Sequence, residues 1–326
     1  MSSDAEVAVE DFESLFHGDP QDIEGRLVAL RPRAAAHPDS SLAPRIESQI
    51  ALVQAMQGHF QQATGTLDAA ENLPGAGLPG ARIQLLIERG RVSHQARDMD
   101  SAFPQFVDAW EFGRQQGLDD QAVNAAHMAA IAARDPDQKV HWNQLALGLA
   151  QDSADPKARA WITVLHNNLG QALIAAGKFS DAFLAFETCR QRADFEQNRL
   201  VERGARWGIA RALRSLGHTD SAIQIQQQLL EEYNRIEASS ELPLELVNMG
   251  RGLVYEELAE LLRENSSAFA AMALENLGVN DWFRDTERNR WNRLLTLQRG
   301  GGLFEAAPIA QPLPAPLFCS AACDGQ

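Results

Sequence analysis

Two cysteines near the C-terminal end of the chain, Cys319 and Cys323, have a spacing that could do chemistry. Two thiols four residues apart could bind a soft metal such as Cu(I), although they would form an incomplete site for zinc. They could also form a disulfide or be modified by a partner enzyme. The only charged residue beside them is Asp324, so no cationic neighbour lowers the thiol pKa. We expect both thiols to be accessible.

The segment that carries these cysteines, residues 299–326, is rich in glycine and proline. Its three consecutive glycines, 300–302, are followed by alternating prolines and then by an apolar end. This composition predicts an extended, poorly ordered tail. The tail could have no role, could dock into a groove of this chain or of a neighbour, or could present its cysteines to a modifying enzyme.

The stretch Gly75-Ala76-Gly77-Leu78-Pro79-Gly80 matches the G-x-G-x-x-G fingerprint of dinucleotide sites. That fingerprint needs a preceding strand and free backbone amides at the start of a helix. Here a helix is predicted before the glycines, and Pro79 lacks an amide, so we interpret the stretch as a linker. The eight histidines include no pair at a metal-binding spacing, and no nucleophile motif is present. We therefore predict that the chain is not an enzyme and needs no cofactor.

The elements that would position any functional residue recur at a nearly constant step of ~40 residues. A turn between two apolar helical stretches recurs at the following marker positions: Gly18, Gly58, Arg97, Asp137, Gly177 and Gly217. Small residues recur at fixed distances on both sides of most markers, as two closely crossing helices require. A period in this range is typical of stacked helical hairpins, each of which buries its apolar face against its neighbours.

Strand signals are almost absent, and helix signals are present throughout. We expect helix pairs at about 6–17 with 20–36, 41–57 with 59–73, 81–96 with 99–116, 119–134 with 137–151, 157–176 with 178–194, and 198–216 with 218–237. Pro32 and Pro104 fall inside two of these helices and predict a kink or an early end. The repeat register breaks after residue 237. We therefore divide the chain into repeats (1–237), a helical capping region (238–298) and the tail (299–326).

One unit of the repeat carries the resemblance to a known family. It contains Leu169-Gly170 in the first helix, Gly177 in the turn, Ala182 early in the second helix and Phe186 after it. This pattern resembles the tetratricopeptide repeat family, over most of residues 45–235. The family's usual unit is shorter than ~40 residues, and its closing proline is missing from most units here. The resemblance implies an all-α solenoid of antiparallel helical hairpins that forms a right-handed superhelix with a C-terminal cap.

In such superhelices the first helix of each hairpin lines the concave face. Positions ten, six and three before each marker then predict a partner-binding groove formed by Arg91, His94, His127, Arg134, Asn167, Gln171, Trp207, Arg211 and Arg214, together with three isoleucines. This row holds four arginines and no carboxylate. It is either a solvated face with a chance share of arginines, or a cradle for an acidic segment or a free C-terminal carboxylate.

Composition limits the classes of partner. The formal net charge of −15 argues against nucleic acid and anionic membranes as partners. No apolar run reaches the ~20 residues of a membrane span, and the acidic N-terminal end does not resemble a signal peptide, so we expect a cytoplasmic, bacterial protein. We predict a non-catalytic scaffold that holds a protein or peptide partner. The alternatives are a carrier that uses the Cys319 and Cys323 tail, and a peptide-sensing regulatory protein.

Overall fold

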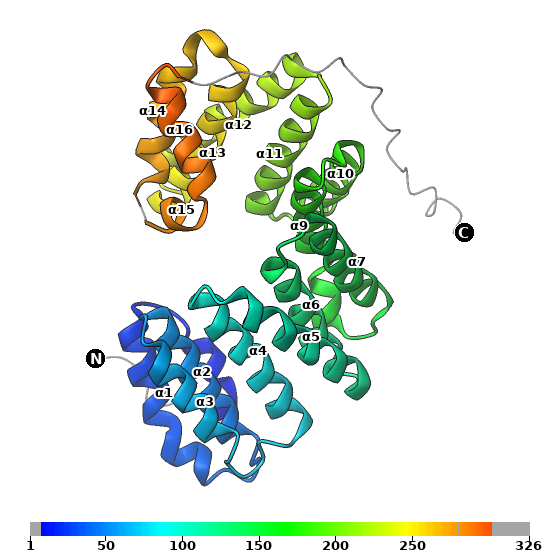
Figure 1. Ribbon diagram of the computed structural model, residues 1–326, viewed down its shortest axis with the longest axis vertical. Coiled ribbons are helices and arrows are strands. Elements are labelled where there is room, and N and C mark those ends of the chain that lie inside the picture. The colour runs from blue at the N-terminus through cyan, green and yellow to red at the C-terminus, as the bar shows by residue number, and fades with distance from the viewer. Residues whose placement is uncertain (1–7, 280, 302–326) are drawn as a thin grey trace. The chain divides into compact units, whose positions relative to one another are not determined.

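The computed structural model describes residues 8–279 and 281–301, and Cys319 and Cys323 lie outside these ranges. Within them the chain forms helices and no strand. The chain divides into two compact units, Met1–Leu165 and His166–Gln326, which we describe separately. Figure 1 shows each unit as a series of antiparallel helix pairs.

Unit 1 begins with a 3-10 helix, η2, at Val9–Leu15. The α-helices that follow are α1 (Pro20–Ala35), α2 (Leu42–Met56), α3 (Phe60–Ala70), α4 (Pro79–Gln95), α5 (Met99–Gln116), α6 (Asp119–Ala132), α7 (Pro136–Asp152), α8 (Pro156–Ala160) and the start of α9 (Ile162–Ala175). Consecutive helices pack against each other, and the first helices of successive hairpins, α2, α4 and α6, are also in contact.

Unit 2 contains the rest of α9 and the helices that follow it. These are α10 (Phe179–Phe195), α11 (Arg199–Ser215), α12 (Thr219–Ser239), α13 (Leu244–Leu261), the short 3-10 helix η3 (Arg263–Asn265), α14 (Ser266–Leu277), α15 (Asp281–Thr286) and α16 (Arg288–Gln298). The fold is an α-solenoid of helical hairpins, as the sequence predicts. The right-handed twist and the division after residue 237 stay predictions.

The turn markers have a clear conformational basis. Gly18, Gly58, Arg97, Gly177 and Gly217 all have a positive φ, between 62° and 94°. A left-handed residue ends a helix and lets the chain reverse into the next one, and glycine adopts that conformation without steric cost. Asp137 is the exception, because it lies in the first turn of α7. There the carboxylate of Asp135 accepts a hydrogen bond from the Gln138 amide at 3.0 Å and begins the helix.

Close helix crossings explain the small residues of the repeat. A Cβ added at Gly90 would lie 2.5 Å from the ring of Phe106 in the partner helix of the hairpin. In unit 2, the ring of Phe186 lies against both Gly170 and Gly208, where an added Cβ would come within 2.7 Å and 2.4 Å of it. The glycines therefore let a fully buried aromatic ring fill the space between helices.

The structure departs from the expected helices at two places. The helix expected at 157–176 is divided at Trp161 into α8 and α9. At Pro104, where the sequence predicts a kink or an early end, the early end is wrong because α5 continues to Gln116, and the kink stays a prediction. Helix α1 ends three residues after Pro32.

Candidate functional site: the first-helix faces of the two units

Eight of the nine predicted groove residues lie on first helices of hairpins, and the ninth, Arg134, follows the end of α6. Arg91 and His94 belong to α4, His127 to α6, Asn167 and Gln171 to α9, and Trp207, Arg211 and Arg214 to α11. The four residues from Arg91 to Arg134 belong to unit 1, and the other five belong to unit 2. Their role in binding a partner stays a prediction.

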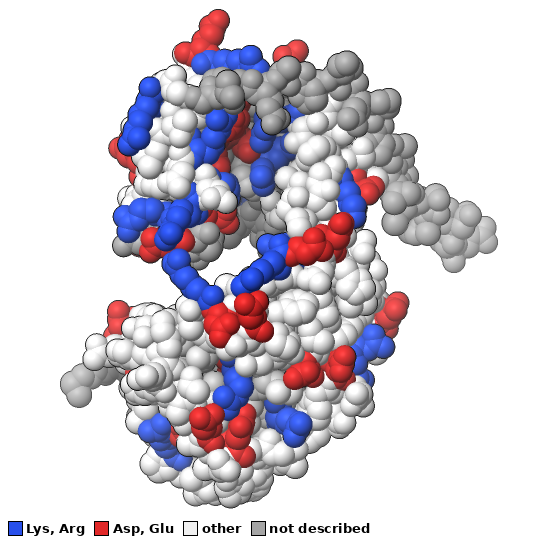
Figure 2. All heavy atoms as spheres, viewed as in Figure 1, with Lys and Arg blue, Asp and Glu red and all other residues white. Residues whose placement is uncertain are grey.

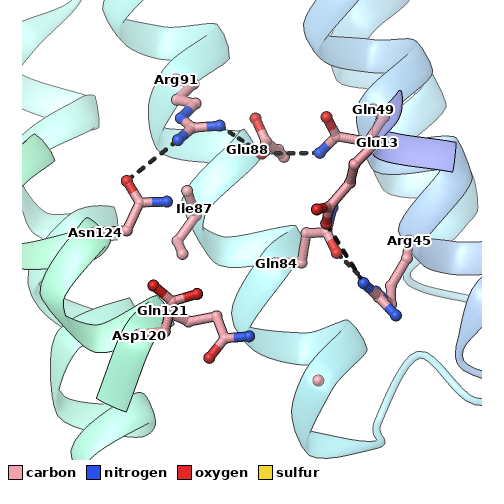
Figure 3. Close-up of a pocket in the computed structure, with 11 residues that line it drawn as sticks. Glu13, Arg45, Gln49, Gln84, Ile87, Glu88, Arg91, Asp120, Gln121 and Asn124 are labelled. Carbon is pink, nitrogen blue, oxygen red and sulfur yellow. Dashed lines mark hydrogen bonds and ion pairs between the residues drawn. The ribbon is translucent and has the colours of Figure 1, made fainter. Parts of the chain in front are cut away.

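Unit 1 contains a polar cavity of about 350 Å³ on the first-helix face. The residues that line it come from η2, α2, α4 and α6 and are shown in Figure 3: Glu13, Arg45, Gln49, Gly80, Gln84, Ile87, Glu88, Arg91, Asp120, Gln121 and Asn124. Of the predicted groove residues, Arg91 and one of the three isoleucines, Ile87, line this cavity. Ligand pockets commonly begin at about this size.

Three amide side chains around the cavity are oriented by charged neighbours. Arg45 Nε donates to Gln84 Oε1 at 2.8 Å, and Arg91 Nη2 donates to Asn124 Oδ1 at 3.2 Å. The third, Gln49, donates its Nε2 to Glu88 Oε1 at 2.9 Å. Each contact fixes which end of the amide is used internally. The opposite ends, two NH2 groups and one carbonyl oxygen, make no hydrogen bond to the other residues drawn in Figure 3.

A buried carboxylate, Glu88, holds this arrangement together. Its side chain is 2% exposed, and its Oε1 accepts hydrogen bonds from both Gln49 and Arg91 at 2.9 Å. Its other oxygen, Oε2, is buried without a hydrogen-bond partner in the structure. Burial raises the pKa of Glu88, although Arg91 and the hydrogen bond from Gln49 oppose the shift. The charge on Arg91 is therefore balanced inside the protein.

The repeat itself contains a signal that could have identified this site. Arg45, Gln84 and Asn124 each lie thirteen residues before a marker, at Gly58, Arg97 and Asp137 respectively. By the same arithmetic, Gln49 and Glu88 each lie nine residues before their markers. The cavity therefore follows the first helices about one turn N-terminal to the row read from the sequence.

The other predicted residues of unit 1 lie in different surroundings. Arg134 is 70% exposed and pairs with Asp100, itself 80% exposed, at 3.1 Å on the surface. The ring of His127 lies 5.6 Å from the ring of Trp161, and burial, with the nearby Arg91, lowers the pKa of His127 to about 4. Burial also lowers the pKa of His94. Both histidines are therefore neutral at physiological pH and add no charge to this face.

In unit 2, the predicted arginines Arg211 and Arg214 contact an internal carboxylate. Glu257 of α13 is 3% exposed, and its Oε2 accepts a hydrogen bond from Arg214 Nε at 2.9 Å. Arg211 Nε approaches Glu257 Oε1 at 3.2 Å without hydrogen-bond geometry, and Arg211 Nη1 donates to Gln171 Oε1 at 2.8 Å. Burial opposes the charge on Glu257, but Arg214 and Arg211 outweigh it and lower the pKa of this carboxyl.

The same network extends to the last helix. Arg290 of α16 donates to both carboxylate oxygens of Glu256, with Nε 2.8 Å from Oε1, and Arg293 bonds Glu260 in the same two-pronged way. The ring of Trp207 lies within cation–π distance of two guanidinium groups, 4.7 Å from that of Arg211 and 5.7 Å from that of Arg290. The indole Nε1 donates to the Leu253 carbonyl at 3.0 Å.

The arginines of the row in unit 2 lie beside carboxylates that the row itself does not contain. After the register break, Glu257 and Glu260 lie six and three residues before Arg263, as Arg211 and Arg214 lie before Gly217. The acidic groups therefore occupy the arginine positions of the next hairpin. On the face shown in Figure 2, acidic and basic side chains lie beside one another rather than in patches of one sign.

Asn167 of α9 lies near the start of unit 2. Its Oδ1 is buried and has no hydrogen-bond partner in the structure, and its backbone interacts with the thiol of Cys189. Cys189 is fully buried, and burial raises its pKa to about 12. Such a thiol packs as a small apolar group and is not a nucleophile.

The described residues contain neither a metal-binding cluster nor a membrane-spanning helix. Among residues 8–279 and 281–301, no group of three or more histidine, cysteine, aspartate or glutamate side chains could hold a metal ion. No helix in these ranges is both long enough and apolar enough to cross a membrane. The proposed tail chemistry of Cys319 and Cys323 falls outside this part of the chain and is not tested by it.

Comparisons with known proteins address the fold. No protein-family model matches this sequence, and a comparison with curated proteins gives no match. A similar solved structure is the crystal structure of a signal transduction ATPase with numerous domains (STAND) protein with a tetratricopeptide repeat sensor, from Pyrococcus horikoshii. The TM-score is 0.59 at 12% sequence identity, and the match covers 90% of this chain and 45% of that chain. The chain folds as a tetratricopeptide-like α-solenoid.

This likeness concerns the backbone alone, because identity at this level does not carry site residues across. The tetratricopeptide-like solenoid spans less than half of the longer protein that it matches. Any function must therefore be argued from the side chains of the first-helix faces.

Proposed function

We propose that this tetratricopeptide-like solenoid is a non-catalytic binding module that holds an extended segment of a partner protein against the first helices of unit 1. The observation that carries the proposal is the cavity between α2, α4 and α6, with its three oriented amides. Tetratricopeptide-like repeats place their first helices on the concave face, which is where extended partners bind.

The chemistry of the lining suits a peptide main chain. A peptide group presents one donor and one acceptor, as a primary amide does. Gln84 Nε2 and Asn124 Nδ2 can donate to carbonyl oxygens of a bound segment, while Gln49 Oε1 can accept from an amide. Because charged neighbours already fix these side chains, little side-chain entropy is lost on binding. Gln121 adds a fourth amide to the same wall.

The lining also supports a non-catalytic role. Its eleven residues include no serine, threonine, cysteine or histidine, the side chains that most often act as nucleophile or general base. Two of its three carboxylates, Glu13 and Glu88, form ion pairs with arginines.

A sensing role is the second candidate. The similar STAND structure is described as carrying a tetratricopeptide repeat sensor. If this chain has a comparable role, binding in unit 1 would be communicated to another domain or protein. This hypothesis predicts a change in hydrogen exchange outside the cavity when a segment binds, and a simple scaffold does not.

The proposed binding face can be tested with a library of ten-residue peptides with N-acetylated and C-amidated ends, screened against the full chain by fluorescence anisotropy. We expect the double variant Gln84→Ala/Asn124→Ala to weaken the selected peptides roughly tenfold or more, since each lost hydrogen bond is worth about 1 kcal/mol. The matched control is Gln61→Ala/Gln62→Ala, two exposed glutamines on the second helix α3. Equal affinity of wild type and the cavity variant would contradict the proposal.

A further inference from the structure

Acidic side chains outnumber basic ones in the lining of the unit 1 cavity. Three carboxylates, Glu13, Glu88 and Asp120, face two guanidinium groups, Arg45 and Arg91. Both arginines are already engaged. Arg45 bonds Gln84 at 2.8 Å and lies 3.6 Å from Glu13, and Arg91 bonds Glu88 at 2.9 Å and Asn124 at 3.2 Å. An incoming anion would have to displace a carboxylate or an amide to reach either one.

Asp120 is the carboxylate of this cavity that lacks a cation. Its Oδ1 accepts a hydrogen bond from the indole Nε1 of Trp161 at 2.9 Å, which fixes the orientation of the side chain. In the part of the chain that the structure describes, no arginine, lysine or histidine forms an ion pair with Asp120. Figure 3 shows its carboxylate beside Gln121 on the α6 wall of the cavity. The second oxygen, Oδ2, therefore remains open to a ligand.

We propose that Asp120 and the amides around it bind a basic side chain, lysine or arginine, of the segment held in the unit 1 cavity. The inference rests on the proposed function and specifies its ligand. Asp120 Oδ2 accepts a charge-assisted hydrogen bond from the ammonium or guanidinium group, and the Gln49 carbonyl oxygen offers a second acceptor on the α2 wall. The net charge of −15 attracts basic segments at long range.

This ligand is opposite in sign to the acidic segment that the arginine row predicts. The row alone suggests a basic groove, but in the folded unit Arg91 neutralises a buried carboxylate. What reaches the ligand is the excess negative charge, which Asp120 carries. The shape agrees, because a cavity of about 350 Å³ has room for one long side chain and a short stretch of main chain.

Asp120 also has a structural explanation that the experiment must separate from ligand binding. It lies in the first turn of α6, where the helix dipole favours a carboxylate. The helix-dipole effect changes the stability of α6 and does not depend on which side chains a bound peptide carries. Selectivity between peptides that differ only in one charge is therefore the decisive readout.

The test uses the peptides selected from the capped library, each resynthesised with its central residue as lysine, arginine, norleucine or glutamate. We expect the norleucine peptide, which keeps the lysine stem without the charge, to bind roughly tenfold more weakly than the lysine peptide. Asp120→Asn keeps the acceptor for Trp161 and should abolish this tenfold preference. Asp108→Asn, at an exposed aspartate of α5, is the matched control and should retain it. Thermal unfolding of each variant reports any separate effect on α6.

Three results would overturn the inference. If Asp120→Asn keeps the full preference for lysine, Asp120 serves α6 alone. If glutamate or norleucine peptides bind as well as lysine peptides in the wild type, the cavity does not select a basic group. In that case the proposed function would still hold if Gln84→Ala/Asn124→Ala weakened the binding of the glutamate and norleucine peptides. If no capped peptide binds at all, the proposed function fails, and the inference fails with it.

Discussion

At the scale of single residues, the contacts of a charged side chain determine its role, and its position in the repeat does not. Arg211 and Arg214 lie where the repeat predicts them, on the exposed side of a first helix. Their guanidinium groups nevertheless contact Glu257, which is 3% exposed. Breaking a buried pair costs more than the pair contributes, because the remaining charge has lost its solvent and its partner.

This contact changes the expected effect of removing the two arginines. If Arg211 and Arg214 were solvated surface residues, Arg211→Ala/Arg214→Ala would change stability little. We now expect the free energy of unfolding to fall by about 2 kcal/mol, discounted because the two arginines are 20% and 33% exposed. Urea unfolding measures the loss. Adding Glu257→Gln should restore part of it, since the amide removes the uncompensated charge; no recovery would contradict this explanation.

The pH dependence of this difference follows from Glu257. Its pKa is lowered below the ordinary value of 4.5, so the ion pair contributes stability above that pH. The contribution is lost as the pH falls through the lowered pKa. In the double variant the carboxyl is buried without Arg211 and Arg214, its two closest cations, and protonation relieves part of the cost of burying its charge. The gap between wild type and variant should therefore be widest near pH 7 and narrow below about pH 4.5.

The residues of the unit 1 cavity could be predicted from the sequence only in part. Arg91 was identified from its distance to the turn marker. Glu88 was not, because a carboxylate on a first helix is usually solvated, and burial depends on how α2 and α4 pack. The period nevertheless contained the information, since Gln49 and Glu88 occupy one repeat position. Equivalent positions of neighbouring repeats therefore predict the residues of this cavity better than a single row of side chains does.

At the scale of helices, the sequence predicts the fold almost completely. Turn residues, capping aspartates and small residues at a step of ~40 determine where helices begin, end and cross. The break at Trp161, which the sequence does not predict, coincides with tertiary contacts: the Trp161 indole contacts Asp120 and His127 of α6, which local propensity cannot reveal. Asp137 differs from the other markers because it lies in the first turn of α7, and the aspartate that caps this helix is Asp135.

Two glycines of α11 distinguish packing from helix propensity. An added Cβ at Gly208 would lie 2.4 Å from the ring of Phe186, which Gly170 bounds as well, whereas a Cβ at Gly204 meets nothing within 4 Å. We expect Gly208→Ala to lower the free energy of unfolding by about 2 kcal/mol through overpacking. Gly204→Ala should raise it by up to ~1 kcal/mol, because alanine favours the helix. Equal changes in the free energy of unfolding by urea would show that helix propensity, and not the close contact with Phe186, determines the effect of both substitutions.

At the scale of the whole molecule, a solenoid exposes the apolar face of its last hairpin unless something covers it. In unit 2 the buried Leu294 and Leu297 of α16 share a cluster with Leu274 and Leu277 of α14. Arg290 and Arg293 bond Glu256 and Glu260 of α13 at the same time. Helix α16 therefore supplies both the apolar cover and the countercharges that the next hairpin would otherwise provide.

Truncation tests this capping role. A chain that ends at Gly278 lacks α15 and α16, so it exposes the apolar face of α14 and leaves Glu256, which is 8% exposed, without its arginine. We expect amide hydrogen exchange of α13 and α14 to quicken roughly tenfold or more, while exchange in α1–α7 of unit 1 stays unchanged, since each hairpin depends mainly on its neighbours. The matched control is a chain that ends at Gly301, which keeps α16. Unchanged protection of α13 in the shorter chain would show that α16 is attached to the solenoid without stabilising it.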